Sequence, residues 1–225
     1  MIGRGKGWAA ASALRQFAWL LGLTWVLGLA GPPGAQPGSA ALPSATHAGD
    51  LARVEDYLNG LTTLKADFVQ INPDGGTVTG ELYYERPDKM RLDYNPPSDI
   101  LIVSDGWHIT YYDRRLEQAS HIFPSSTPLG FLLSDDIRLS GDVTTTQVER
   151  SAGELHITLV QTDEPNEGSI RLSFAEDPLE LRRWTLVDAQ GLATHVILER
   201  PQLGLALDGE LFRFRNPQFY PDARN

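Results

Sequence analysis

Apolar and polar residues alternate along most of the chain after residue 60, and this period of two predicts short antiparallel strands. The clearest run extends from Gly80 to Asp113, where turn residues such as Asn95-Pro96-Pro97 separate four strands. Further strands are expected near residues 66–71, 117–122, 143–150, 154–161, 169–175, 181–188 and 193–199, and a short strand near 212–214. The chain is therefore expected to be mainly β (α+β), with about eleven antiparallel strands.

The predicted strands carry their large apolar residues on one face, because successive side chains of a strand point to opposite sides of the sheet. A twisted open sheet rarely stays flat beyond about 10 strands, so this sheet is expected to curl and to have a concave side. The apolar face needs a cover, which is either a packed core or a ligand. We assign to this face Phe68, Leu82, Tyr84, Met90, Leu92, Tyr94, Ile100, Ile102, Ile109, Tyr111, Ile157, Leu159, Leu172, Phe174, Trp184 and Leu186.

Two amphipathic helices are expected beside the sheet. The first runs from Asp50 to about Asn59, with Asp50 as its N-cap and Gly60 at its end. The second spans Thr127 to Ser134 and has a proline in its first turn, where proline is tolerated. Each helix has a single apolar stripe and is expected to plug the concave side. The stripes consist of Leu51, Val54 and Leu58 in the first helix and Leu129, Leu132 and Leu133 in the second.

The first 41 residues have the pattern of a secretory signal peptide. Arg4, Lys6 and Arg15 precede an apolar run at 17–30, and a stretch rich in small residues follows. The apolar run is shorter than the roughly 20 residues that a membrane-spanning helix needs. An uncleaved anchor is the alternative. The cut is expected between residues 40 and 48, which leaves 42–225 as a single domain.

The expected mature protein is acidic and lacks cysteine. Removal of residues 1–41 leaves 16 basic and 29 acidic residues, a net charge of −13. Such a surface repels nucleic acid and is not attracted to anionic lipid. The absence of cysteine excludes disulfides, thiol chemistry, Cys-ligated metals and lipidation at an N-terminal cysteine. The mature protein is therefore expected to diffuse freely.

No catalytic or metal-binding pattern occurs in the sequence. Nucleophile-elbow, zinc-protease, P-loop and EF-hand motifs are missing, and no two histidines have helical ligand spacing. We expect neither an enzyme nor a cofactor or metal. Arg86, followed by Pro87, ends a strand whose apolar face includes Tyr84. Its five donors either point into water or reach the unsatisfied carbonyls at the end of a covering helix.

The sequence resembles the LolA family, the periplasmic carriers of outer-membrane lipoproteins. The resemblance covers nearly all of the mature protein, and its pieces are weak alone but fairly specific in this order and spacing. They are Phe68-x-Gln70, Gly80-x-Leu82 before Arg86-Pro87, Pro97, Ile102-Val103-Ser104-Asp105-Gly106, Tyr112-Asp113, Glu117-Gln118, Thr127-Pro128, Leu132-Leu133 and the tail 212–222.

This resemblance implies an incomplete barrel, here called a half-barrel, whose helices form a lid over an apolar cavity lined by the apolar face. The cavity would hold the acyl chains of lipoproteins in transit from an inner-membrane ABC-type releasing complex to an outer-membrane acceptor lipoprotein or the outer membrane itself. Arg86 matches the arginine that latches the lid. The carrier is expected to be a periplasmic monomer, and the missing cysteine favours the carrier over the acceptor. Met90, Leu92 and Thr110 depart from the aromatic residues common in the family.

Three other functions fit parts of the pattern. The first is a carrier or sensor of another lipid or glycolipid on the same half-barrel. The second is a secreted β-sheet enzyme, which the absent nucleophile and metal motifs disfavour. The third is a structural or adhesive β-domain whose apolar face is a packed core, because strand alternation alone does not show a cavity.

Overall fold

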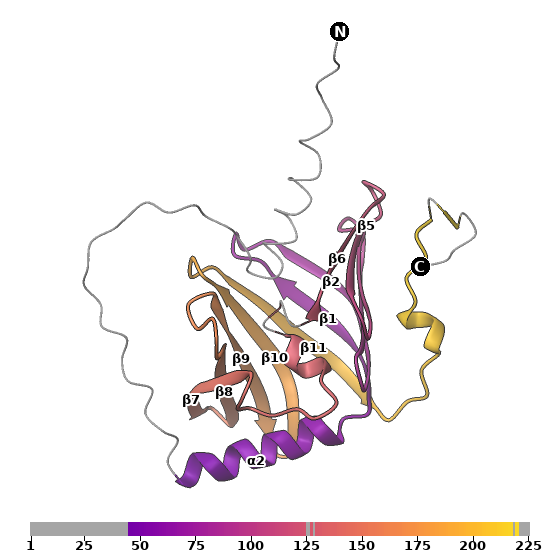
Figure 1. Ribbon diagram of the computed structural model, residues 1–225. Coiled ribbons are helices and arrows are strands. Elements are labelled where there is room, and N and C mark those ends of the chain that lie inside the picture. Colours follow the sequence, from indigo (N-terminus) through magenta and orange to yellow (C-terminus); the bar gives the residue numbers. More distant parts are fainter. Residues whose placement is uncertain (1–44, 125–126, 128, 218, 221–225) are drawn as a thin grey trace, which may run out of the picture.

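One antiparallel sheet dominates the computed structural model, which describes residues 45–124, 127, 129–217 and 219–220 (Figure 1). The expected signal peptide and Pro128 lie outside these residues. The predicted mainly β fold with about eleven strands is confirmed. The strands are β1 (Thr63–Ile71), β2 (Thr77–Glu85), β3 (Lys89–Tyr94), β4 (Ile100–Asp105), β5 (Ile109–Asp113), β6 (Gln118–Ile122), β7 (Val143–Ser151), β8 (Glu154–Gln161), β9 (Gly168–Glu176), β10 (Leu179–Asp188) and β11 (Ala193–Leu203).

The order of the strands leaves the sheet open. It runs β6-β5-β4-β3-β2-β1-β11-β10-β9-β8-β7, so β6 and β7 follow each other in sequence but form the two opposite edges. The sheet curls, and the connection between β6 and β7 lies on its concave side (Figure 1). The fold is therefore a half-barrel whose open side is crossed by its own backbone.

The core lies on the concave side, as the alternation predicts. In β1, buried and half-buried residues alternate without a break. All residues assigned to the apolar face belong to one core cluster, in which Met90 and Ile100 are partly buried and the others are buried. The six apolar residues of the two predicted helices pack against the same cluster.

Helix α2 (Ala45–Gly60) lies across one end of the curved sheet (Figure 1) and begins earlier than predicted. Asp50 is therefore not its N-cap. Both carboxylate oxygens of Asp50 accept hydrogen bonds from Arg150 in β7. The Tyr57 hydroxyl accepts a bond of 3.1 Å from the Leu181 backbone N–H, and its ring meets Phe174 edge-on at 5.8 Å. These contacts anchor α2 along its length to the β7–β10 part of the sheet.

The second predicted helix is wrong in type and extent. This segment instead forms a short 3-10 turn, η2 (Gly130–Leu133), with bonds of 3.0 Å from Leu132 N to Leu129 O and 3.2 Å from Ser134 N to Phe131 O. Glycine disfavours a helix interior. The carbonyls of residues 132–135 also accept hydrogen bonds from β2 and the β2–β3 turn, so they are not available to continue an α-helix. In the described part of the protein, no helix is both long and apolar enough to cross a membrane.

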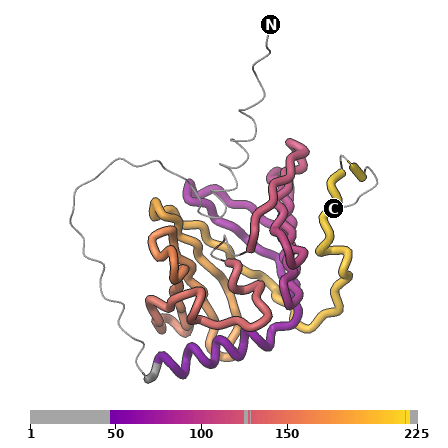
Figure 2. The backbone as a smooth tube through the Cα atoms, viewed as in Figure 1, coloured from indigo at the N-terminus to yellow at the C-terminus, as the bar shows by residue number. Residues whose placement is uncertain are grey.

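The strand predicted near 212–214 is also wrong. The tail instead forms a 3-10 turn, η3 (Gly209–Phe212), capped by Asp208, whose side chain accepts from Glu210 N. It runs along the outside of the sheet, away from the concave core (Figure 2). Arg91 donates to Leu211 O at 3.1 Å, and Phe214 packs on Tyr112 with their ring centres 5.1 Å apart. These contacts hold the tail against the sheet although it does not pair as a strand.

Candidate apolar binding site

A small apolar cavity lies between α2, η2 and the concave face of the sheet. Its volume is ≈ 40 Å³, whereas small-molecule sites commonly measure about 300–1,000 Å³. The structure is therefore closed, with its own side chains filling the space. The cavity is lined by Leu58, Leu61, Leu64, Leu82, Tyr84, Met90, Leu129, Leu132, Leu133, Leu181 and Trp184.

The residues predicted from the sequence divide into two groups around this cavity. Four apolar-face residues and four lid residues line it directly. The others pack in the same core cluster farther along the concave face, where Phe68 meets Tyr94 edge-on with their ring centres 5.0 Å apart. The second group is Phe68, Leu92, Tyr94, Ile100, Ile102, Ile109, Tyr111, Ile157, Leu159, Leu172, Phe174 and Leu186, together with Leu51 and Val54 of α2.

Three of the lining residues were not assigned to the site from the sequence. Leu64 shares the face of Phe68 through Ala66, so a longer reading of that strand would have included it. Leu61 directly follows the glycine that ends α2. Leu181 breaks the period of two, because a β-bulge after it places both Leu181 and Trp184 on the buried face.

Arg86 joins α2 to the segment that follows η2. Its Nη1 donates to the Leu58 carbonyl at 2.8 Å and to Asn59 Oδ1 at 2.9 Å. Its Nη2 donates to the carbonyls of Ser134 at 3.3 Å and Asp135 at 2.6 Å. Of the two alternatives left open by the sequence, the side chain takes the one that reaches the helix end. Its role as a latch stays a prediction.

Two polar side chains of α2 reinforce this junction, and neither was singled out from the sequence. Asn59 donates from Nδ2 to the Ile137 carbonyl at 2.8 Å, and its Oδ1 accepts from Ile137 N at 2.9 Å. Glu55 Oε1 accepts from Leu139 N at 2.7 Å. The segment that follows η2 therefore binds α2 by main-chain groups that would otherwise be buried without partners.

Strand β2 and the β2–β3 turn hold η2 from the other side. The Tyr84 hydroxyl donates to the Leu132 carbonyl at 2.5 Å, and Asp88 N donates to the Leu133 carbonyl at 3.1 Å. Burial raises the pKa of Tyr84 to about 12, although the Arg86 charge opposes the shift. The hydroxyl therefore stays protonated, and remains a donor, throughout the neutral pH range.

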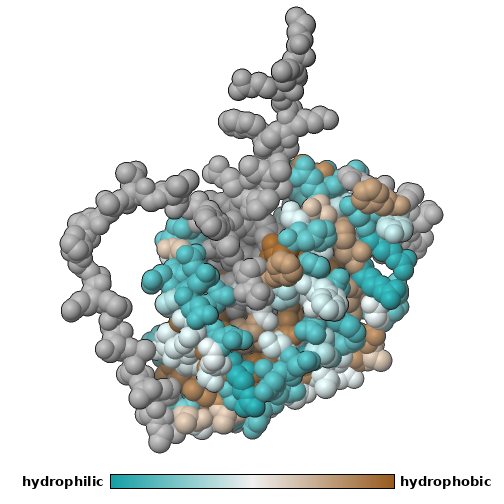
Figure 3. Space-filling view, in the orientation of Figure 1, coloured by the Kyte–Doolittle hydropathy of each residue, from teal (hydrophilic) through white to brown (hydrophobic). Residues whose placement is uncertain are grey.

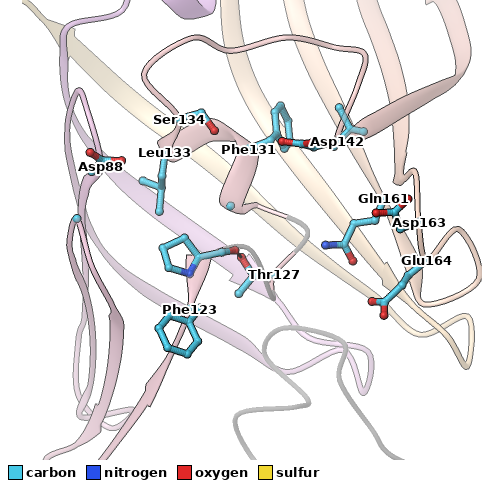
Figure 4. Close-up of a pocket in the computed structure, with 14 residues that line it drawn as sticks. Asp88, Phe123, Thr127, Phe131, Leu133, Ser134, Asp142, Gln161, Asp163 and Glu164 are labelled. Carbon is cyan, nitrogen blue, oxygen red and sulfur yellow. Dashed lines mark hydrogen bonds between the residues drawn. The ribbon is translucent and has the colours of Figure 1, made fainter.

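A second, larger hollow of ≈ 690 Å³ opens on the other side of η2, between the two edges of the sheet (Figure 4). Asp142, Asp163 and Glu164 line one side of it, and Phe123 lies across from them (Figure 4). No group of three or more histidine or acidic side chains among the described residues could hold a metal ion. Leu133 lines both this hollow and the apolar cavity, so η2 is the partition between them.

We expect Tyr84→Phe to loosen η2 without unfolding the protein. The change removes the donor to the Leu132 carbonyl and should cost about 1–2 kcal/mol of local stability. Amide hydrogen exchange of residues 131–135 should therefore quicken by about tenfold. Tyr83→Phe is the matched control, because Tyr83 donates to Glu81 Oε2 at 3.0 Å and not to η2. Equal exchange in both variants would contradict the assignment.

Comparison with known proteins identifies several relatives of this chain. A protein-family model described as "Outer membrane lipoprotein carrier protein LolA" matches residues 59–215. An outer-membrane lipoprotein carrier protein of Methylococcus capsulatus is 32% identical over 176 residues, which cover 74% of this chain and 83% of that protein. An uncharacterized protein of Rickettsia prowazekii is 24% identical over 170 residues, which cover 76% and 78% respectively. A solved LolA superfamily protein from Nitrosomonas europaea has 10% identity over 73% of this chain and 97% of that chain, with a TM-score of 0.42.

Proposed function

Because this chain belongs to the LolA family of outer-membrane lipoprotein carriers, we propose that it carries lipoproteins through the periplasm by binding their acyl chains on its concave face. An inner-membrane ABC-type complex would load it, and an outer-membrane acceptor lipoprotein or the outer membrane itself would receive the cargo. The proposal includes export by a signal peptide at 1–41, a single carrier domain at 42–225 that acts as a monomer, and no catalytic step.

The observation that carries the proposal is the position of η2. Leu133 separates the large hollow at the open side of the sheet from the apolar cavity behind it. Apolar surface is visible between hydrophilic margins on the face above α2 (Figure 3). Displacement of η2 would join the two spaces and expose the apolar face to an acyl chain. Helix α2 is a long element anchored to the β7–β10 part of the sheet, whereas η2 is a single short turn held by hydrogen bonds from Tyr84, Asp88 and Arg86. We therefore take η2 as the part of the lid that moves.

The energies fit a carrier that must also release its cargo. An acyl chain of about 15 methylenes gains roughly 12 kcal/mol on burial, at about 0.8 kcal/mol per methylene. Taking Leu129, Leu132 and Leu133 out of the core costs roughly 5–9 kcal/mol, at about 1.5–3 kcal/mol per leucine. Association itself costs about 4–15 kcal/mol more. The gain from one chain is thus of the same order as the costs, so the closed lid competes effectively with the ligand for the same surface.

The test is the identity of molecules bound to the mature protein purified from its native envelope. Mass spectrometry should find acylated lipoprotein, and the yield should fall in Met90→Glu, which places a charge on the apolar face that would contact the acyl chain. Leu116→Glu is the control, because Leu116 is an exposed leucine on the β5–β6 turn. Phospholipid or glycolipid alone would indicate a carrier or sensor of another lipid on this fold. Repeatedly empty protein would indicate a packed core.

A further inference from the structure

The outer face of the sheet holds a groove of ≈ 430 Å³, on the opposite side from the apolar core. Two neighbouring cross-strand rows build it. In one row His156, Ser173, Arg183 and Ile197 lie opposite each other on β8, β9, β10 and β11. In the next row Arg171, Thr185, His195 and Ile71 do so on β9, β10, β11 and β1. We call these eight residues the outer-face groove.

The floor of the outer-face groove consists of two hydrogen-bonded imidazole–hydroxyl pairs. His156 Nδ1 and Ser173 Oγ are 2.9 Å apart, and Thr185 Oγ1 and His195 Nδ1 are also 2.9 Å apart. His156 and Ser173 are only 5% and 2% exposed, although they lie on the outer side of the sheet. Burial, followed by the nearby charge of Arg171, lowers the pKa of His156. The uncharged form of the His156 imidazole is therefore favoured, and it forms a neutral hydrogen-bonded pair with Ser173 in the floor.

Two arginines flank this floor. Arg171 lies opposite Thr185, and Arg183 lies two residues before Thr185, so the two arginines are diagonal neighbours. Diagonal positions are about 7–8 Å apart, within reach of long side chains. Arg171 pairs with Glu149 at 2.9 Å and Arg183 with Glu154 at 2.5 Å, and all four side chains are partly exposed. Exposed ion pairs contribute only about 0–1 kcal/mol, so an anion can replace the carboxylates at small cost.

The arrangement of Ser173, His156 and Glu154 resembles a hydrolytic triad, but it lacks the geometry for that chemistry. Glu154 Oε2 is 3.7 Å from His156 Nε2, and Arg183 engages the same carboxylate oxygen. Ser173 is in the middle of β9, whose backbone pairs with β8 and β10 on its two sides. Backbone donors committed to strand pairing cannot form an oxyanion hole. Ligand binding is therefore a better use of this site than catalysis.

We propose that the outer-face groove binds a phosphate group, either as free phosphate or as the monoester headgroup of a lipid. Guanidinium groups match phosphate oxygens in bidentate geometry, and Arg171 and Arg183 flank the imidazole–hydroxyl floor from diagonal positions. The cationic pair stands out because the expected mature protein has a net charge of −13. The groove lies on the far side of the sheet from the candidate apolar site, so this proposal does not depend on the cargo bound there.

The first test titrates inorganic phosphate into the mature protein at constant ionic strength. Calorimetry should detect one site, and the ring signals of His156 and His195 should shift in NMR spectra. Arg171→Gln combined with Arg183→Gln should weaken binding at least tenfold, the equivalent of one charge-assisted hydrogen bond. Arg182→Gln with Arg200→Gln is the matched control, since it removes the same charge from exposed ion pairs outside the groove. No saturable binding by the wild type, or equal binding by both double variants, would overturn the proposal.

A second test distinguishes the two sources of the phosphate group. Vesicles of phosphatidylcholine with phosphatidic acid are compared with vesicles of phosphatidylcholine alone in a flotation assay. Flotation that requires phosphatidic acid and both groove arginines supports a lipid headgroup. Phosphate binding without flotation supports a soluble phosphate ligand. If the Arg171→Gln, Arg183→Gln variant does not bind phosphate but still floats with phosphatidic acid, the groove is not the lipid-binding site.

Discussion

Arg86→Leu is expected to shift the lid toward its open state by about two orders of magnitude. The substitution removes donors from four acceptors, which lie at the end of α2 and just after η2. Hydrogen bonds from a charged donor contribute about 1.5–3 kcal/mol each, and bonds from one side chain are not additive. A total loss of about 3 kcal/mol lowers the equilibrium constant for closing of the lid roughly 100-fold.

Two measurements follow from this shift. A fluorescent fatty acid should bind the Arg86→Leu protein more tightly and dissociate from it more slowly, because the closed lid competes less well with the ligand. Amide exchange of residues 129–135 and of the last turn of α2 should also quicken. If the protein is a lipoprotein carrier, cargo transfer to an acceptor should slow, since the state that expels the cargo is weakened.

The control for this prediction is Arg115→Leu, which removes an exposed arginine on the turn between β5 and β6. It should leave probe affinity, exchange and transfer unchanged. Arg86→Lys should lie between the wild type and the leucine variant, because an ammonium group cannot span both sets of acceptors with a planar fork. Wild-type exchange and probe dissociation in Arg86→Leu would exclude the latch.

Gly80→Ala is expected to cause a large loss of stability. A Cβ at Gly80 would lie 2.3 Å from the Asp93 carbonyl oxygen on β3 and 2.5 Å from Cζ of Phe68 on β1. The Phe68 ring is buried and packs edge-on against Tyr94, so any movement away from the new methyl group would disturb that packing. The carbonyl belongs to the β2–β3 pairing and cannot move without disturbing that ladder. We expect a loss of about 3 kcal/mol, and a fall in Tm of about 6–12 °C.

Thermal unfolding followed by circular dichroism checks this prediction, with Gly49→Ala as the matched control. Gly49 lies in α2, and a Cβ there would meet nothing within 4 Å. Alanine is the better helix former, so this change should raise stability by about 0.5–1 kcal/mol. Phe68→Leu combined with Gly80→Ala should recover only part of the loss, since the contact with the Asp93 carbonyl persists. Similar Tm values for the two alanine variants would contradict the account.

Much of the fold could be predicted from particular residues. Leu92 and Tyr94 alternate with polar neighbours, Leu82 and Tyr84 keep the same spacing of two, and all four are buried in one concave cluster. The spacing of Leu51, Val54 and Leu58 located α2, because its apolar stripe must face that cluster. Both patterns are local, since each follows from the period of side-chain directions in a single strand or helix.

Other features depend on contacts that no local pattern contains. The segment around Leu132 reads as an amphipathic helix, yet Tyr84 and Arg86 take its carbonyls and leave one 3-10 turn. Leu181 fills the cavity only because a bulge in β10 changes the register against β9. Arg86 was a candidate to reach a helix end, but its bonds to Ser134 and Asp135 depend on where the β6–β7 connection passes.

The sequence by itself determined the mainly β class, the apolar face and the first helix, and it marked Arg86 as a candidate to bind the end of a covering helix. The first three follow from the spacing of apolar side chains along the backbone, and the last follows from the hydrogen-bond donors of a single side chain. Only the tertiary structure decided that the cavity is filled, that η2 divides it from the open side, and that two rows of polar residues meet on the outer face. Curvature and register set these features, because they bring together residues that are far apart in sequence and share no repeat.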